Sequence, residues 1–413
     1  MTVALRRTFS SLAVPNYRRY FAGQAVSVSG NWMQTVAELW LILKLTGSGL
    51  LVGLTPAMQF LPLLLVGAWG GVLADRLPKH RLLMTTQALM ALPALALWLL
   101  YVGGGVEPWM VLALVFVRGA INAVDNPTRQ SFAAELVGPD RLVNAVSLNS
   151  VVINTGRVVG PALAGVVIAT AGVGPCFLLN ALSFAAMLAA LATMDRSALH
   201  ARRPAARQRG QVRSALRHVT ATPALWIPLA MMVVVGTLSY NFQVLLPLLA
   251  HDTWHGSAST YAALTVAMGA GSLLGALAAG HRARVSPRLL VGAALSLGTA
   301  ELAVAGAPTL ALQAAALVPL GALTVTFATG VNSTLQLAVD PALRGRVMAL
   351  YSIVFLGSTP IGSPLVGWLA QAAGPRAGLL LGALAALATG LAAQAAFHRE
   401  HAPASARREH APA

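Results

Sequence analysis

Long apolar runs, separated for the most part by short polar turns, dominate the chain. A membrane-spanning helix needs about 20 mostly apolar residues. Twelve runs meet this length, and their pattern predicts an all-α membrane protein with twelve transmembrane helices. The runs lie near 20–44, 50–73, 82–102, 108–127, 143–170, 174–194, 224–250, 259–280, 288–306, 309–330, 345–371 and 376–397.

One connection and one end of the chain are polar. Residues 195–222 hold seven arginines and no long apolar run, which indicates a basic cytoplasmic linker with a short surface helix from Gln211 to Val219. This linker separates an N-terminal six-helix half at 1–194 from a C-terminal six-helix half at 223–397. The tail at 398–413 is expected to be disordered and cytoplasmic.

Composition supports a lipid environment. Hydrophobic residues make up 57% of the 413 residues, charged residues only 10%, and mean hydropathy is +0.71. The net charge of +16 is typical of nucleic-acid-binding proteins, but the placement of the charges argues otherwise. If the N-terminus is cytoplasmic, all but four of the 28 lysines and arginines fall on the cytoplasmic side of the membrane. Both termini are therefore expected on the cytoplasmic side of a plasma (inner) membrane. The same distribution explains the positive charge, so no nucleic acid is expected as a partner. The four exceptions are Lys44, Arg118, Arg157 and Arg376.

Three short motifs recur about half a chain later, at nearly the same offset, and each lies at an equivalent point of a six-helix unit. Matches of this kind indicate a duplication. An even number of helices returns the chain to its starting side, so the two six-helix halves are predicted to be parallel, as in many transporters. The pairs are Gly67-x-x-x-Gly71 with Gly271-x-x-x-Gly275, Asn126-x-Thr128-x-Gln130 with Asn332-x-Thr334-x-Gln336, and Gly160 and Gly165 with Gly362 and Gly367.

The first of these motifs opens a polar hairpin, Gly67 to Arg81, between the second and third runs. Glycines four residues apart let helix backbones approach closely. Asp75 follows at the end of the run, where a carboxylate can pair with Arg76 or Arg81, or can simply be a solvated loop acid. The counterpart at Gly280-His281-Arg282 lacks the acid.

On these residues the chain resembles the major facilitator superfamily, and within it the drug–proton antiporter branch that includes enterobactin-type exporters, the transmembrane secretion effectors. The resemblance covers roughly 15–397. It rests on five motifs: Gly30-Asn31-Trp32-Met33-Gln34-Thr35-Val36-Ala37, Leu45-Thr46-Gly47-Ser48, Gly70-Gly71-Val72-Leu73-Ala74-Asp75-Arg76, Asp125-Asn126-Pro127-x-Arg129-Gln130, and Gly160-Pro161-Ala162-Leu163-Ala164-Gly165, with Asn144-Ala145 and Asn149-Ser150 between the last two. Glu38 departs from the pattern, because similar proteins usually carry a neutral residue there.

The resemblance implies roles for several of these positions. Asp75, with Gly67, Gly71, Arg76 and Arg81, resembles a cytoplasmic latch between the two halves. The run of Gly160, Pro161 and Gly165 in helix five resembles the antiporter motif of exporters and implies outward transport, although simple helix packing also explains it.

Among the charged residues inside predicted helices, three carry the most weight, because charges there are costly and usually face a cavity or a partner. Helices one, four, seven and ten line the cavity in the resembling fold, so Glu38 of helix one and Arg118 of helix four are expected to face each other. Arg118 also resembles the arginine that related antiporters use in proton coupling. Glu38, Arg118 and Arg157 are therefore the proton-coupling candidates. As alternatives, Glu38 could snorkel outward, and Arg157 could bind backbone carbonyls.

Other polar residues fall on the same helices. Asp125 and Arg129 are spaced for a local ion pair, or for a gate. Glu301 is expected near the outer surface, away from coupling. Candidate substrate-cavity residues, for which helix packing is an equal alternative, are Met33, Gln34, Tyr240, Asn241, Gln243 and Gln313.

Several kinds of chemistry are not indicated. The chain has no phosphate-binding G-x-x-x-x-G-K-[ST] loop and a single cysteine, Cys176, and no cofactor or metal site is expected, including at His251 and His255. The sequence therefore predicts a monomeric, proton-coupled exporter of a small lipophilic drug, siderophore or metabolite. A lipid or lysolipid translocator of the same fold is the main alternative, and a membrane enzyme or scaffold is a remote one.

Overall fold

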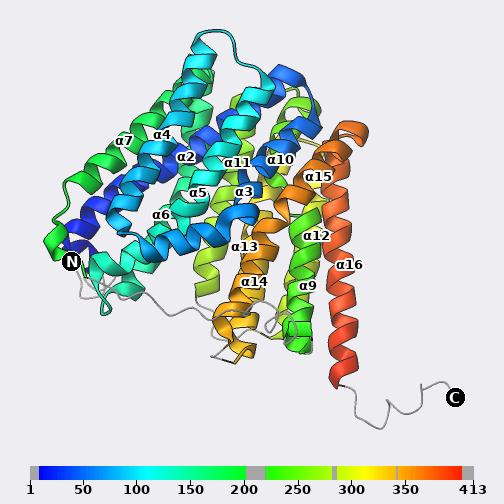
Figure 1. The fold of residues 1–413 in the computed structure, drawn as a ribbon. Coiled ribbons are helices and arrows are strands. Elements are labelled where there is room, and N and C mark those ends of the chain that lie inside the picture. Colours follow the sequence, from blue (N-terminus) through cyan, green and yellow to red (C-terminus); the bar gives the residue numbers. More distant parts are fainter. Residues whose placement is uncertain (1–8, 201–218, 221, 281–285, 341–342, 402–413) are drawn as a thin grey trace. The chain divides into compact units, whose positions relative to one another are not determined.

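The computed structural model describes residues 9–200, 219–220, 222–280, 286–340 and 343–401. Every long element in this part of the chain is a helix, and it contains no strand (Figure 1). An all-helical chain is expected in lipid, because a helix satisfies its backbone hydrogen bonds within one segment. The α-helices of the described residues are α2 (Pro15–Thr46), α3 (Gly49–Arg76), α4 (Lys79–Val102), α5 (Pro108–Val137), α6 (Leu142–Ala171), α7 (Gly174–Ala192), α9 (Pro223–Leu238), α10 (Phe242–Leu248), α11 (Ala258–Gly280), α12 (Pro287–Gly306), α13 (Leu310–Ala338), α14 (Arg344–Gly357), α15 (Thr359–Ala373) and α16 (Pro375–His401).

Local sequence explains where several helices begin and end. Proline occupies the first turn of α2, α5, α9 and α12, where its missing N–H is no loss. Gly47 ends α2 in a left-handed conformation with φ of 60°, and the Ser48 hydroxyl then accepts from the Leu51 N–H to begin α3. The tight turn between the first two membrane helices is therefore encoded by Gly47-Ser48.

Eleven helical stretches in the described residues are long and apolar enough to span a membrane. The remaining long helix, α2, has 32 residues but buries Gln24, Gln34 and Glu38. With α2 as the first span, the twelve-helix architecture predicted from the sequence is confirmed.

Two of the predicted helices are interrupted. Helix seven ends as α9 at Leu238, and the chain resumes as α10 at Phe242, followed by a wider π-helical turn over Leu249–Thr253. Helix eleven divides into α14 and α15 at Ser358. Each still forms one membrane-spanning stretch, Pro223–Thr253 and Arg344–Ala373, as predicted. The three residues left between α9 and α10 give helix seven a local break that the sequence pattern did not indicate.

The ends of the polar connections differ slightly from expectation. The surface helix expected at Gln211–Val219 lies outside the described residues except for its last position. The tail expected from residue 398 begins later, because α16 continues to His401. Residues 402–413 lie outside the described part of the chain.

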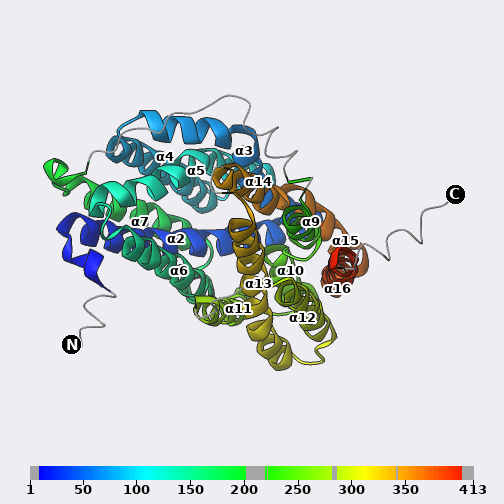
Figure 2. The same ribbon diagram turned by 90° about the horizontal axis from the view of Figure 1, so that it is seen from below.

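The described residues form two compact units. Unit 1 contains those within Met1–Arg207 together with Gln243–Gly269 and Ser363–Pro375. Unit 2 contains those within Gln208–Phe242, Ala270–Gly362 and Arg376–Ala413. Inside unit 1, α3 packs along α5, α2 lies between α6 and α7, and α4 contacts α5 and α7 (Figures 1 and 2). Inside unit 2, α13 packs on α12 and α9. The two six-helix halves predicted from the sequence, with their boundary in the linker, stay a prediction.

The sequence repeat reappears in side-chain contacts. In α5 the Gln130 amide donates to the Asn126 side-chain oxygen at 3.2 Å, and in α13 Gln336 donates in the same way to Asn332 at 2.6 Å. The duplicated motif thus forms the same pair of amides in both copies. The threonine between them also repeats its role, because the hydroxyls of Thr128 and Thr334 both donate to the carbonyl four residues earlier.

The glycine pairs of helices five and eleven contact equivalent partners. Gly160 lies on α2, where an added methyl group would be 2.7 Å from the Ser29 carbonyl oxygen, and one at Gly362 would be 1.9 Å from the Thr237 carbonyl oxygen of α9. These positions therefore need glycine for close helix packing, which is the packing alternative considered for the Gly160-Pro161 motif.

The second glycine of each pair contacts a helix from the other half of the sequence, and these contacts lie inside unit 1. An added methyl group at Gly165 would be 2.5 Å from the Ala262 Cβ of α11, and Gly367 lies against the Gly49 carbonyl of α3. Beside this contact, Gln371 Oε1 of α15 accepts from the Ser48 hydroxyl at 2.8 Å and from the Leu50 N–H at 3.1 Å. We call the α3–α15 and α6–α11 contacts the glycine seal.

Candidate functional site

A buried ion pair joins α2 to α5. Glu38 Oε2 accepts from Arg118 Nη2 at 2.5 Å, and the side chains are only 1% and 5% exposed. The expectation that these two residues face each other is confirmed, and the alternative that Glu38 snorkels outward is wrong. The reason is that Arg118 gives the carboxylate a partner at depth, so Glu38 gains nothing by reaching a membrane surface.

The pair continues into an uncharged chain of hydrogen bonds. Gln34 Nε2 donates to the other Glu38 oxygen at 2.7 Å, and Asn180 Nδ2 of α7 donates to Gln34 Oε1 at 2.5 Å. Ser183 then donates to Asn180 Oδ1 at 2.8 Å. Gly30 of α2 makes room for this chain, because an added methyl group would lie 2.5 Å from both Asn180 Oδ1 and Ser183 Oγ.

The polar network gives each oxygen of the Glu38 carboxylate one partner, Arg118 or Gln34. It runs from Arg118 through Glu38, Gln34 and Asn180 to Ser183. The arginine neutralises its charge, whereas the glutamine holds its orientation. Protonation of Glu38 would remove the attraction for Arg118, whose Nε has no hydrogen-bond partner among the described residues. The geometry therefore allows one proton to make or break a link between α2 and α5. Asn180 and Ser183 were not among the residues predicted from the sequence.

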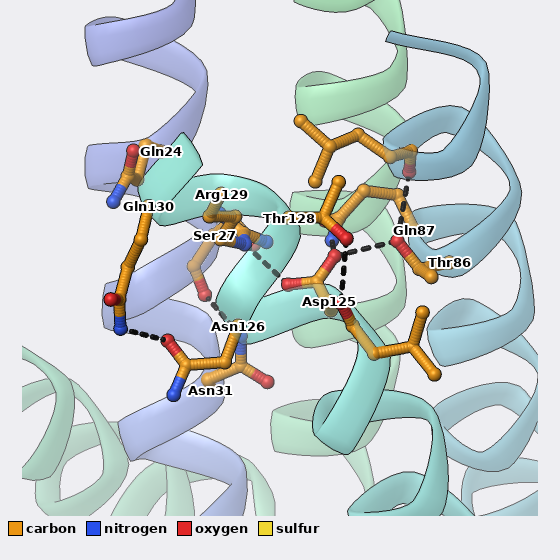
Figure 3. A network of polar contacts seen from close by, with 12 residues as sticks. Gln24, Ser27, Asn31, Thr86, Gln87, Asp125, Asn126, Thr128, Arg129 and Gln130 are labelled. Carbon is orange, nitrogen blue, oxygen red and sulfur yellow. Dashed lines mark hydrogen bonds and ion pairs between the residues drawn. The ribbon is translucent and has the colours of Figure 1, made fainter. Parts of the chain in front are cut away.

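A second buried carboxylate, Asp125 of α5, holds α4 (Figure 3). Its Oδ1 accepts from the Thr86 hydroxyl at 2.6 Å and from Gln87 Nε2 at 2.8 Å, and its Oδ2 pairs with Arg129 one turn along α5. Asp125 is 2% exposed. The local ion pair expected from the spacing is confirmed, and the side chain also fastens α5 to α4. A gating role for Asp125 and Arg129 stays a prediction.

Arg157 lies on an aromatic ring. Its guanidinium carbon is 5.5 Å from the ring centroid of Trp32 on α2, a cation–π distance. The side chain is exposed, and within the described residues it has no ion pair. It also has no hydrogen bond to a backbone carbonyl there, so the alternative role in binding carbonyls is not seen. A place for Arg157 in proton coupling is not tested by this geometry.

The hairpin from Gly67 to Arg81 is held by residues other than those expected. Asp75, Arg76 and Arg81 are exposed, and Asp75 makes no ion pair in the described part of the chain. Instead Lys79 at the start of α4 donates to Glu135 near the end of α5 at 2.7 Å. An Asp75 latch stays a prediction, and its pairing with Arg76 or Arg81 does not occur here.

The glycines of the same motif have different neighbours in the two copies. An added methyl group at Gly67 would meet only Leu63 of its own helix, whereas Gly70 lies directly against the Ala123 carbonyl of α5. In the second copy, Gly271 and Gly275 lie against the carbonyls of Val318 and Ala322 on α13. Close packing of the second helix of each half on the fourth is thus common to both copies, and in the first copy Gly70 takes part in it.

The candidate substrate-cavity residues are largely occupied by packing. Gln34 belongs to the buried network, the Tyr240 hydroxyl donates to the Thr324 carbonyl at 2.7 Å, and Gln313 Nε2 donates to the Val304 carbonyl at 3.0 Å. Met33 and Asn241 are buried, and Gln243 is half-buried. Contact of these residues with a substrate stays a prediction.

Glu301 of α12 does not lie at the periphery of the protein, so the peripheral placement expected for it was wrong. The side chain is 0% exposed and accepts from the Ser239 hydroxyl at 2.5 Å. The local sequence carries a signal for this burial: Gly298 is one turn before Glu301 on the same helix face, and it packs on Ala383 and Leu387 of α16.

Known transporters resemble this chain over most of its length. A family model described as transmembrane secretion effector matches residues 6–412. The multidrug efflux pump Tap of Mycolicibacterium fortuitum is 29% identical over 382 residues, which cover 88% of this chain and 91% of that protein. The staphyloferrin A transporter of Staphylococcus aureus is 28% identical over 166 residues, which cover 40% of this chain and 42% of that protein.

Solved structures share the fold at low sequence identity. The nucleoside transporter NupG gives a TM-score of 0.73 at 12% identity, covering 92% of this chain and 99% of NupG. A bacterial homologue of the human lysosomal transporter Spinster, in an inward-facing and unoccupied conformation, also gives a TM-score of 0.73. Its sequence identity is 15%, and the match covers 94% of this chain and 99% of that protein. The fold and the family are those of transporters and not of enzymes. The chain therefore belongs to the transmembrane secretion effector family of major facilitator transporters.

Proposed function

We propose that the protein exports a small lipophilic drug, siderophore or metabolite from the cytoplasm across the plasma membrane, in exchange for protons. The single observation that carries this proposal is the buried Glu38–Arg118 ion pair at 2.5 Å. A charge pair at membrane depth is rare unless it serves transport. The names of the relatives, which include the efflux pump Tap and a staphyloferrin A transporter, support export and the class of cargo.

In this proposal, Glu38 alternates between two states. As an anion it holds Arg118 and keeps α2 bound to α5. When it takes up a proton from outside, the attraction to Arg118 is lost and the two helices are free to separate. Because the network is buried, a proton can reach it only after a conformational change, which is what links proton entry to substrate exit.

The glycine seal suggests which side is closed. If both termini are cytoplasmic, as the distribution of lysine and arginine indicates, the Gly47-Ser48 turn lies at the outer end of α2 and α3. The seal lies at that same end of unit 1, where Trp40 of α2 also stacks on Tyr261 of α11 with ring centroids 6.2 Å apart. The outer ends in unit 1 are thus packed shut, which fits a state awaiting substrate from the cytoplasm.

The test is transport by the purified full-length protein in liposomes that enclose a pH-sensitive dye. Lipophilic drugs, siderophores and lysolipids are each added to one side under an imposed pH gradient. Proton movement that depends on a drug or siderophore supports the proposal. Lysolipid movement alone would make the protein a lipid translocator, and the absence of any substrate-dependent proton movement over the panel would refute proton-coupled export.

The matched variants are Glu38→Gln and Gln130→Glu. The first keeps the size and hydrogen-bonding capacity of the side chain but cannot carry a proton. The second adds an acid on α5 at an exposed position outside the buried network. Loss of proton movement in Glu38→Gln, with Gln130→Glu unaffected, would assign the coupling to Glu38.

A further inference from the structure

Glu301 is the one acid in the described helices of unit 2 that is completely buried, and it has no cation beside it. One carboxyl oxygen, Oε1, is bonded to the Ser239 hydroxyl at 2.5 Å. The other oxygen, Oε2, has no hydrogen-bond partner among the described residues. None of the ion pairs in the described part of the chain includes Glu301.

In the described residues, no charged side chain of the surrounding helices lies beside Glu301: Arg288 is at the start of α12, and His398 to His401 are 16 or more residues along α16 from Gly382, which contacts Glu301. α9 and α13 contain no titratable residue. α16 begins with Arg376, but that guanidinium is engaged elsewhere, because it donates to the Ala307 carbonyl at the end of α12 at 2.9 Å. The titratable group that interacts with Glu301 is the Tyr240 phenol, which itself donates to the Thr324 carbonyl and has Tyr351 of α14 as its neighbour.

The consequence for Glu301 follows from the cost of burying charge. An ionised carboxylate without a counter-charge in a dry, apolar site is far less stable than the neutral acid. The neutral acid is therefore the form of Glu301 that these surroundings favour. Glu38 differs in having the Arg118 guanidinium beside it, which stabilises its anion. Two buried carboxyl groups, one with a counter-charge and one without, bind protons with different affinity, as a proton-transfer pathway requires.

The position of Glu301 places it at the break between α9 and α10. Ser239, its hydrogen-bond partner, is the first residue after α9 and begins the break before α10. Gly382 of α16 covers the carboxyl group from the other side: an added methyl group would be 2.6 Å from Oε2 and 3.0 Å from the Ser239 Cα. A displacement of the break would remove the serine and admit water to Oε2, and both changes favour ionisation.

We propose that Glu301 is a proton-binding site, loaded in this conformation and emptied when the α9–α10 break moves. The ligand is H⁺, and the site consists of Glu301, Ser239 and the wall formed by Gly382. The site itself is independent of the proposed export. Only the use of its proton, as a second coupling proton beside that of Glu38, rests on that function.

Infrared spectroscopy tests the site without any transport. A protonated carboxyl group absorbs at a frequency separate from that of carboxylates and amides, so a pH titration of the reconstituted full-length protein shows each buried acid. We expect a carboxylic-acid band in the wild type that is missing in Glu301→Gln. The band should persist in Glu38→Gln and in Thr299→Val, a control on the same helix whose hydroxyl is exposed and bonded within α12.

A second variant keeps the acid and changes only its partner. Ser239→Ala removes the hydrogen bond to Oε1, so the band should shift to higher frequency without disappearing. A wild-type spectrum without a protonated carboxyl, or a band that is equal in wild type and Glu301→Gln, would overturn the proposal, and so would a band unmoved by Ser239→Ala.

The transport arm separates this inference from the proposed function. If wild-type liposomes move protons with substrate, Glu301→Gln should move fewer protons per substrate, whereas Thr299→Val should match the wild type. If the wild type moves none, the proposed function fails, while the infrared result still decides whether Glu301 holds a proton. Equal proton movement per substrate in wild type and Glu301→Gln would refute its coupling role.

Discussion

Glu38 on α2 and Arg118 on α5 form an ion pair whose closest atoms are 2.5 Å apart, and both side chains are almost completely removed from solvent. Among the described residues, the groups that bond to the Glu38 carboxylate besides Arg118 are neutral. Removal of one partner therefore leaves the other charge buried without a counter-charge, whereas removal of both leaves no buried charge there.

Arg118→Leu should destabilise the protein strongly, because it leaves the Glu38 carboxylate buried and unpaired. The loss expected on breaking a buried pair is roughly 3–5 kcal/mol. Unfolding can be followed with a thiol-reactive dye, because Cys176 is the only cysteine and is fully buried. The double variant Glu38→Gln/Arg118→Leu should regain much of the loss, and equal instability of the single and double variants would contradict the pairing argument.

Glu38→Gln alone should separate binding from coupling. Glutamine can still accept from Arg118 and pair with Gln34, so the fold and the binding of a neutral substrate should survive. Transport driven by a pH gradient should fall to background, since no proton can be carried at this position. Unchanged gradient-driven transport would remove Glu38 from the mechanism.

Asp125→Asn and Asp75→Asn form a matched pair of acid-to-amide variants. At Asp125 the change removes the charge that binds Arg129 and replaces one acceptor oxygen with an N–H donor, so the unfolding temperature should fall markedly. At Asp75, which is exposed and without an ion pair in the described residues, stability should stay near that of the wild type.

Transport should respond differently at Asp75. If Asp75 acts as a latch in another conformation, Asp75→Asn should lower transport at normal protein levels. Full transport by this variant would refute the latch, and a large loss of stability would contradict the exposed position of the side chain.

Cross-linking can test the glycine seal. Ser48 Oγ and Gln371 Oε1 are 2.8 Å apart, so cysteines at both positions, in a Cys176→Ala background, should react together with a short bifunctional thiol reagent. We expect the cross-linked protein to lose transport and to regain it when the link is reversed. Each single-cysteine variant, treated with the same reagent, is the control. Undiminished transport in the cross-linked protein would show that α3 and α15 need not separate.

Much of the fold was predictable from the sequence, because each membrane helix corresponds to a long apolar run. The duplication was predictable because three motifs recur at nearly the same offset. The breaks at Ser239 and Ser358 were missed. Hydropathy averages over about 20 residues and does not register a local change of backbone direction. The polar triplet Ser239-Tyr240-Asn241 and the run Gly357-Ser358-Thr359-Pro360 are the signals that could have marked them.

The site was predictable only where charge made a residue conspicuous. Glu38, Arg118 and the Asp125–Arg129 pair were found because charges are rare in this chain. The sequence did not indicate Asn180 and Ser183, because amides and hydroxyls are common on membrane helices. It did not indicate Glu135 either, because a glutamate near the end of a helix has many potential partners. Glu301 was placed wrongly, because position along the chain gives depth in the membrane but not which face of the helix is buried.

The glycine seal has a consequence for the energetics of the transport cycle. Its contacts join backbone carbonyls, glycine and alanine carbons and one neutral amide, so parting it moves no formal charge. Opening at this end should then be electroneutral, and membrane voltage and ionic strength should have little influence on it. Any voltage sensitivity of the cycle would have to arise at the buried acids.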